Sequence, residues 1–515
     1  MRHSTLSWLG LALAVVAFAA STPAFAQGVT TAAINGTVVD DAGLGLPGAS
    51  VLAVHGPSGT QYGVSTRADG QYNLRNLRVG GPYTVTVSFV GFTSVQRTGI
   101  MLELSETETV DIQLRSADAT LGEAIVTAEG NAIINPSNIG TGTNVSEEEI
   151  DRLPTISRSL TDFTRLTPQF SQVGTGSEAG TSVGGTASRY NNIQVDGAAL
   201  NDAFGLESSG SPGGSSGTQP ISLDAVSEFR VAIAPYDVTQ GGFTGGNINV
   251  VTRSGTNTFT GSVYGLGRNQ DLVGTGVDGD SFGDFTDLTY GARLGGPIVQ
   301  DKLFFFGSVE LGDTNEPITA SFNDVAAAQE IQSILSTQYG RETGTIGAFD
   351  AGTTSRKVFG RLDYNLNPSN TLTARFNYVQ GRKDDGISRS STFYTLEDRL
   401  YTRENTNTSS VVELRSILGQ NMANLFRASL QTNRQPSVLE FPAFPSIEIR
   451  GLGTDGRSTV VAGPDQFRGA NNIDADVLEL TNNFNYFVGD HVVTVGTQNT
   501  FSQFSNLFIR NFYGY

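Results

Sequence analysis

The chain has 515 residues, more than one ordinary domain needs, and its 62 glycines with 38% hydrophobic and 16% charged residues favour β-structure with many loops. A net charge of −18 argues against nucleic acid as a partner, because the phosphates would be repelled. The absence of cysteine excludes disulfides and thiolate metal sites, and three scattered histidines predict no zinc site and no cofactor.

The first 26 residues have the composition of a secretory signal peptide. Arg2 supplies positive charge, Leu9–Ala20 forms the apolar core, and Ala24-Phe25-Ala26 fits the small-residue rule for cleavage between Ala26 and Gln27. The alternative is an uncleaved membrane anchor, but the apolar core is shorter than the ~20 residues a spanning helix needs. The sequence therefore predicts a secreted protein with Gln27 as its new N-terminus.

Residues 27–115 have the pattern of a small β-sandwich, prealbumin-like or immunoglobulin-like. Short alternating runs such as Ala49–Ala53 and Tyr83–Val87 recur between turn-forming residues. The run STRADGQYNLRNLRVGGPYTVTVSFVGF, Ser65–Phe92, resembles a carboxypeptidase regulatory-like domain, which is non-catalytic in its family. A carbohydrate-binding or adhesive module would show the same fold pattern and is the alternative.

Residues 116–140 are predicted to be a linker, because glycine, asparagine and proline interrupt any regular element. One short β-prone run is embedded in it, consisting of Glu123, Ala124, Ile125, Val126, Thr127 and Ala128. A free run of this kind can add as a strand to a partner's sheet edge. The same run could instead be the last strand of the preceding domain, and its local sequence leaves both interpretations open.

Residues 141–253 are predicted to be an α+β domain. Ser146 and Glu149 form a capping box before a short helix, and a second helix is expected over Ser159–Leu166. Ile193–Gly197 has the pattern of a strand and turn in which Asp196 forms the turn and is not a catalytic acid. Thr175–Thr186, rich in Gly, Ser and Thr, is predicted to be a loop.

Residues 254–515 have the pattern of long amphipathic strands from an outer-membrane antiparallel β-barrel. In the hairpin Lys357–Gln380, alternation places Leu362 and Phe376 toward lipid, and Arg361 and Arg375 toward the lumen. Short turns are predicted at Gly295-Gly296-Pro297 and Gly489-Asp490-His491, and long outer loops at Asn269–Asp287 and Gly312–Ser355. A soluble sandwich or propeller is the alternative, because soluble strands also alternate.

Two runs carry a family resemblance. GGFTGGNINVVTRSGTNTFTGSVYG, Gly241–Gly265, resembles the end of the plug and the first barrel strand of a TonB-dependent outer-membrane receptor. RYNNIQVDGAALNDAFG, Arg189–Gly205, resembles the plug's VDG region, and both are close to the Oar-like branch. The resemblance implies that residues 141–253 are the plug and residues 254–515 the first part of the barrel.

Several functional expectations follow from that resemblance. It implies an outer-membrane location, a periplasmic N-terminal domain and energised transport of an unknown substrate, with no enzymatic reaction. It implies contact with outer-membrane lipid and with TonB, and Glu123–Ala128 resembles a TonB box. Fewer candidate strands follow Gly255 than the ~22 of plugged transporters, which predicts the N-terminal part of a longer receptor. An adhesin or structural protein without transport is the alternative.

Overall fold

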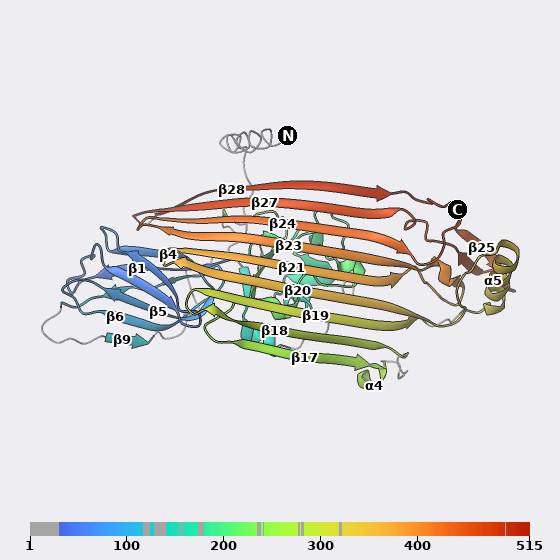
Figure 1. Cartoon of the computed structure of the whole chain (residues 1–515), viewed down its shortest axis with the longest axis horizontal. Helices are drawn as coiled ribbons and strands as arrows, with labels where there is room; N and C mark the ends of the chain where they lie inside the picture. Colours follow the sequence, from blue (N-terminus) through green and yellow to red (C-terminus); the bar gives the residue numbers. More distant parts are fainter. Residues whose placement is uncertain are drawn as a thin grey trace, which may run out of the picture.

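The computed structural model describes residues 30–116, 124–127, 141–153, 155, 158–173, 180–233, 238–239, 241–276, 279, 283–318, 322–489 and 491–515. The predicted signal peptide with its cleavage site, Ala26 and Gln27, lies outside these residues, as do Glu123 and Ala128. Along the described chain, a small β-domain packs against one end of a large curved sheet, and a mixed domain lies behind that sheet (Figure 1).

The N-terminal domain is the predicted β-sandwich. Its core contains fully buried residues from both sheets, among them Ile34, Leu74 and Val85. One sheet consists of β1 (Ala32–Val39), β4 (Gln71–Leu77), β7 (Thr107–Thr109) and β8 (Ile112–Gln113). The other, in spatial order, consists of β3 (Thr60–Ser65), β2 (Ser50–His55), β5 (Gly80–Ser88), β6 (Val95–Leu102) and β9 (Ala124–Thr127).

The described residues of 141–253, for which we keep the name plug, fold as an α+β domain, as predicted. Its central sheet runs in the order β10 (Thr141–Val145), β15 (Val226–Ile233), β16 (Gly246–Thr252), β13 (Asn192–Val195) and β14 (Ala198–Ala199). Around it lie β11 (Phe170–Val173), β12 (Gly180–Val183), α2 (Glu147–Arg152), α3 (Leu160–Thr164), η3 (Ser188–Tyr190), η4 (Gly214–Ser216) and η5 (Leu223–Ala225).

Of the local predictions made for the plug, one is confirmed and two differ from the structure. The capping box is confirmed, because Ser146 accepts from the Glu149 N–H and Glu149 accepts from the Ser146 N–H. The second helix is shorter than predicted. The loop predicted over Thr175–Thr186 is wrong for Gly180–Val183, which pairs with β11 as β12. Its glycine-rich composition gave no sign of that partner strand.

The large sheet contains nine antiparallel strands among the described residues, in chain order (Figure 1). They are β17 (Thr260–Asn269), β18 (Thr286–Val299), β19 (Leu303–Ile318), β20 (Phe349–Asn367), β21 (Asn370–Asp385), β23 (Tyr401–Leu418), β24 (Met422–Leu439), β27 (Asn471–Val488) and β28 (His491–Phe508). A short helix, α4 (Gln270–Val273), follows β17. No helix among the described residues is both long and apolar enough to cross a bilayer.

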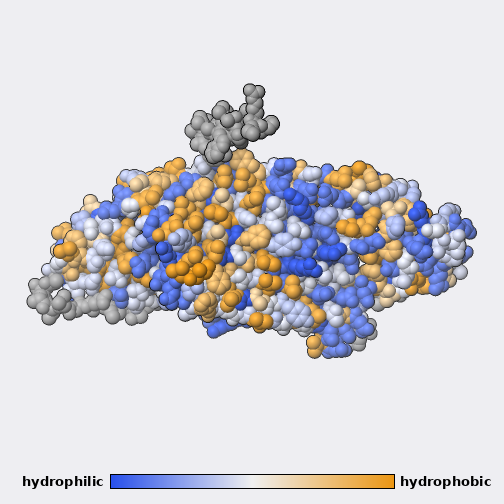
Figure 2. All heavy atoms as spheres, in the orientation of Figure 1, coloured by the Kyte–Doolittle hydropathy of each residue, from blue (hydrophilic) through white to orange (hydrophobic). Residues whose placement is uncertain are grey.

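The predicted orientation of the β20–β21 hairpin is confirmed. Leu362 and Phe376 are 46% and 45% exposed on the outer face, whereas Arg361 and Arg375 are buried on the inner face. The outer face of the sheet carries hydrophobic residues over the part nearer the β-sandwich (Figure 2). Such an apolar band is the surface that an outer-membrane strand presents to lipid.

The turn predicted at Gly295-Gly296-Pro297 is wrong. These residues continue β18, pairing with Phe306, Phe305 and Phe304, and the chain turns at residues 300–302. Gly296 is needed for space: a Cβ there would lie 2.3 Å from the Phe259 ring. The turn between β27 and β28 is confirmed, with Gly489 at φ 53°.

At the end of the sheet far from the β-sandwich, three loops fold together into a unit that we call the loop cap (Figure 1). It contains α5 (Val325–Tyr339), β22 (Phe393–Thr395), η6 (Glu397–Arg399), β25 (Ile447–Leu452) and β26 (Ser458–Ala462). These elements share a core that includes Leu335, Tyr394, Phe444 and Val460. The first of these loops is shorter than predicted, because β19 and β20 extend beyond their expected ends.

Candidate functional site: an ion-pair network between plug and barrel wall

The VDG turn of the plug places one carboxylate against the barrel wall. Asp196 and Gly197 both have left-handed backbone angles, φ 47° and 70°, so the chain reverses there as predicted. The Asp196 carboxylate accepts from the Thr252 N–H at 2.9 Å and from the Thr252 hydroxyl at 2.7 Å. Thr252 ends β16, so the turn is fixed to the last plug strand before the barrel begins.

Two barrel arginines meet this carboxylate. Arg361 of β20 and Arg375 of β21 are directly opposite each other in the hairpin, where two like charges would repel. Asp196 lies within 2.9 Å of Arg375 and 3.5 Å of Arg361, so it offsets that repulsion. Arg375 also donates to the Val195 carbonyl at 2.6 Å, and Arg361 to the Thr252 carbonyl at 3.0 Å.

Asp363 holds Arg361 in this orientation. The Arg361 guanidinium donates to both Asp363 oxygens at 2.9 Å, a two-point geometry that fixes its plane. Thr373 adds a third hydrogen bond to the carboxylate at 2.8 Å. Buried pairs of this kind add little net stability, but removing one partner typically costs about 3–5 kcal/mol. Displacing the plug would remove Asp196 from the buried Arg375 and Arg361, so these ion pairs oppose that displacement.

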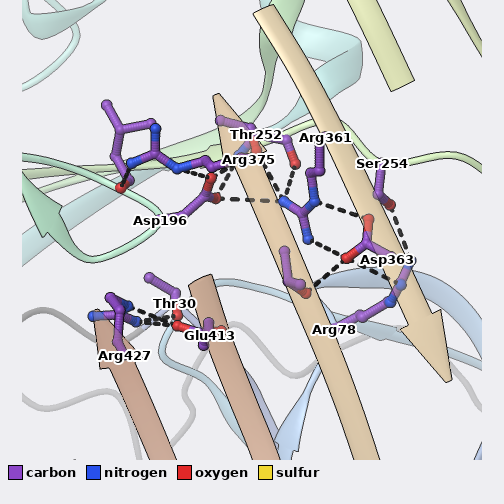
Figure 3. Close-up of polar contacts among 12 residues, drawn as sticks. Thr30, Arg78, Asp196, Thr252, Ser254, Arg361, Asp363, Arg375, Glu413 and Arg427 are labelled. Atoms are coloured by element: carbon purple, nitrogen blue, oxygen red, sulfur yellow. Dashed lines mark hydrogen bonds and ion pairs between the residues drawn. The ribbon is translucent and has the colours of Figure 1, made fainter. Parts of the chain in front are cut away.

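A second branch consists of Arg427, Glu413 and Thr30 (Figure 3). Arg427 of β24 is buried, and its Nε donates to Glu413 of β23 at 2.7 Å. Its guanidinium also lies against the plug turn, where a Cβ on Gly197 would be 2.2 Å from an Arg427 nitrogen. Arg427 further donates to the Thr30 hydroxyl at 3.2 Å, which brings the start of the β-sandwich into the network.

A third branch also comes from the β-sandwich. Arg78 is buried, pairs with Asp363 at 3.3 Å and donates to the Ser254 hydroxyl at 3.0 Å (Figure 3). Ser254 lies between the last plug strand and the first barrel strand. Residues of all three domains thus meet in one buried cluster of alternating charges.

The predicted partner-contacting run lies apart from this network. Its described part, Ala124–Thr127, is β9, the edge strand of a sandwich sheet, and it pairs with β6 in parallel. The register joins Val95 to Ala124 and Thr98 to Thr127. The run is thus placed on the preceding domain, which was one of the two interpretations of its sequence.

Two cavities lie between the plug and the inner face of the sheet. The larger, about 1030 Å³, is lined by plug residues such as Arg158 and Gln219 and by Thr289, Thr314 and Lys383 of the sheet. The smaller, about 500 Å³, is lined by residues that include Phe204 and Arg403. Within the described part of the chain, no group of three or more His, Cys, Asp or Glu side chains could hold a metal ion.

Comparisons with known proteins agree with this architecture. The carboxypeptidase regulatory-like domain family matches residues 33–115, and an outer membrane beta barrel domain family matches residues 251–353. The TonB-dependent transporter Oar of Myxococcus xanthus is 29% identical over 382 residues, which cover 69% of this chain and 34% of that protein. The chain therefore spans about a third of the length of this curated relative.

Solved structures resemble the chain in fold. The outer membrane transporter YddB from Escherichia coli aligns with a TM-score of 0.51 at 12% identity, covering 70% of this chain and 48% of that one. The siderophore receptor PirA from Acinetobacter baumannii aligns with a TM-score of 0.47 at 15% identity, over 70% and 48% of the two chains. The two family matches and the relative show that the chain is an outer-membrane homologue of the TonB-dependent transporter Oar with a carboxypeptidase regulatory-like domain, and the alignment with YddB shows that it shares the fold of that outer membrane transporter.

Proposed function

We propose that the chain forms part of a transporter that imports a substrate across the outer membrane, driven by TonB, and that it performs no covalent chemistry. The observation that carries this proposal is the plug, which is fixed to the inner face of the sheet by buried ion pairs centred on Asp196. An external force would be needed to pull the plug away from these ion pairs. The sandwich end of the barrel would face the periplasm and the loop cap the outside.

TonB would act on residues 123–128. Strand addition binds a partner mainly through backbone hydrogen bonds, and Ala124–Thr127 is already a strand at a sheet edge. In this proposal the run leaves β6 and pairs with TonB. Tension would then reach β10 first, because this edge strand of the plug sheet follows the linker and pairs with β15 from Thr141↔Ile233 to Val145↔Phe229.

Force on β10 has a short route to the ion-pair network. β15 pairs with β16, and β16 ends at Thr252, whose N–H and hydroxyl bind Asp196. Removing β10 and disturbing β15 would therefore loosen the turn that holds Arg361 and Arg375. The two cavities beside the plug would then widen into a path for the substrate.

Proline substitutions test the TonB contact in the full-length receptor. Ile125→Pro and Val126→Pro remove backbone N–H donors and should abolish binding of purified TonB periplasmic domain. Ile125→Ala keeps the hydrogen bonds and should bind within about twofold of the wild type, which corresponds to about 0.4 kcal/mol. Normal TonB binding by both proline variants would rule out this run as the contact.

Protein abundance and uptake separate the remaining possibilities. If residues 124–127 serve only as a structural strand, the proline variants should lower the abundance of the receptor. If they contact TonB, substrate uptake per receptor molecule should be lost even after correction for the abundance of the receptor, because the run also pairs with β6. Dissipating the inner-membrane proton gradient should abolish that uptake in wild-type cells. If the protein were an adhesin, its adhesion would not depend on the proton gradient.

A further inference from the structure

The β-sandwich sits across the ends of the barrel strands, and it contacts a turn or junction at several points along the sheet. In each contact a sandwich loop or strand end is hydrogen-bonded to a residue near the end of a large-sheet strand or just before the first strand, and the donor comes from either side. They are Asn257 N–H to Pro57 O at 2.9 Å, Asn365 to Thr60 at 3.0 Å, Arg67 to Gly489 O at 3.0 Å and Asn76 to Asn424 O at 3.3 Å.

The same domain also contacts the plug. Glu228 of β15 accepts from the Leu104 N–H at 2.8 Å, and Arg230 donates to the Leu104 carbonyl at 3.1 Å. Asn144 of β10 donates to Glu103 at 2.8 Å. The sandwich therefore lies against the two plug strands that tension on the linker would reach first.

Arg78 joins these contacts to the ion-pair network. Its side chain is 6% exposed, and its carboxylate partner Asp363 is 1% exposed. Asp363 is also the residue that fixes Arg361, which in turn meets Asp196 of the plug. The contact of the sandwich with the sheet and the contact of the plug with the sheet thus both depend on the Asp363 carboxylate. Loss of one contact therefore changes the charge balance at the other.

We infer that the β-sandwich is a second closure of the barrel, latched by Arg78, and that it must leave its seat before the plug can open a path. Thirteen residues separate Thr127 from Thr141, enough to reach roughly 45 Å when extended, so the domain could move aside without unfolding. The closure itself is independent of TonB; only its release during transport rests on the proposed function.

A reversible crosslink tests the closure. The chain has no cysteine, so Thr60→Cys/Asn365→Cys in the full-length receptor would introduce a pair at a contact of 3.0 Å. Receptors in planar lipid bilayers would be exposed to urea on the side that carries the sandwich, so that the plug is displaced. The measured quantity is the frequency of channel openings. Oxidation should reduce the opening frequency at least tenfold, and dithiothreitol should restore it.

Three controls keep the result interpretable. Each single-cysteine variant should open equally often with and without oxidant, and a gel shift reports whether the disulfide has formed. Gly59→Cys/Asp301→Cys provides a second crosslink at another turn, because a Cβ on Gly59 would lie 3.0 Å from the Asp301 carboxylate carbon. Arg78→Met should raise the opening frequency of the uncrosslinked receptor, because Arg78 is the proposed latch.

The possible outcomes are distinct. Equal opening of the oxidised and reduced double-cysteine variant, in receptors whose gel shift shows that the disulfide has formed, would overturn the closure. No TonB is present in the bilayer, so a positive result would stand even if the receptor proved not to use TonB. Loss of TonB binding without any change in bilayer openings would affect only the proposed function.

Discussion

Asp196 combines two roles that are usually separate. Its backbone adopts a left-handed turn conformation, which Asp and Asn tolerate better than most residues. Its side chain supplies negative charge between Arg361 and Arg375, and Arg361 has Asp363 as a further carboxylate partner. The turn was evident from the sequence Val-Asp-Gly; the ionic role was not, because both partners lie more than 160 residues away.

Asp196→Asn separates these two roles. Asparagine keeps the turn and one hydrogen-bond acceptor, but it leaves the buried Arg375 without its carboxylate partner. We expect the plug to be released at a lower urea concentration than in the wild type. The free energy of plug release should fall by about 3–5 kcal/mol if the charge pair dominates. The measurement is the urea midpoint for protease cleavage of the plug in the full-length receptor. An unchanged midpoint would show that the ion pairs do not hold the plug.

Glu228 makes the contact between plug and sandwich sensitive to pH. Burial raises the pKa of its carboxyl to about 7, and the hydrogen bond from the Leu104 N–H opposes that rise; Glu103 and Glu106 raise it further, and Arg230 lowers it. The docked state thus binds a proton more tightly than an undocked state in which Glu228 is exposed. Its contribution to docking is full below about pH 4.5 and is lost as pH rises through about 7.

The expected result is weaker docking at pH 8 than at pH 6. Hydrogen exchange at the Leu104 amide would report it, because that N–H is protected only while the domains are in contact. Glu228→Gln cannot ionise, so its docking should change little between these pH values and should exceed that of the wild type at pH 8. A wild-type protein with the same protection at both pH values would contradict the assignment.

At the scale of single elements, the alternating pattern of β20 and β21 predicted both the hairpin and its two faces. Alternation works there because one face meets lipid and the other meets the plug, so a register shift of one residue would bury charge in hydrocarbon. The Gly295–Pro297 turn failed for the opposite reason. Its glycines serve close packing against Phe259 and Gly255, a need that composition alone cannot distinguish from a turn.

Substitutions on the two faces of this hairpin should have different consequences. Leu362→Arg or Phe376→Arg places a charge in the lipid-facing band and should reduce outer-membrane assembly, at a cost of about 2–4 kcal/mol near mid-bilayer. Arg361→Gln should leave assembly intact and loosen the plug. Heat-modifiable migration of the full-length barrel measures assembly, and equal defects in both classes would mean that the faces are assigned wrongly.

At the scale of the whole molecule, the order of the three regions was predictable, because each has its own periodicity and turn spacing. Their mutual contacts were not. Arg78, Glu413 and Arg427 were not identified as site residues, since alternation predicts which face a residue lies on and says nothing about its partner. The position of Ala124–Thr127 was undecided for the same reason: a short β-prone run fits several sheet edges.

The loop cap offers the last test at this scale, because it joins three loops that are far apart in the sequence. Tyr394 is fully buried at its centre, contacts Phe322 at 5.2 Å between ring centroids and accepts from the Gly347 N–H at 3.1 Å. Tyr394→Ala removes a large buried ring and should cost about 3–5 kcal/mol. If the three loops fold as one unit, hydrogen exchange should accelerate together in α5, β22 and β26.

The strands below the cap should stay protected, since their hydrogen bonds and their packing on the plug do not involve this core. Tyr339→Ala on α5, in the same cap, is the matched control, because Tyr339 is 67% exposed and its loss should change exchange little. Acceleration confined to residues 393–395 would contradict a cooperative cap and leave three independent loops. Cooperative loss would show that the three loops form a single folding unit at this end of the sheet.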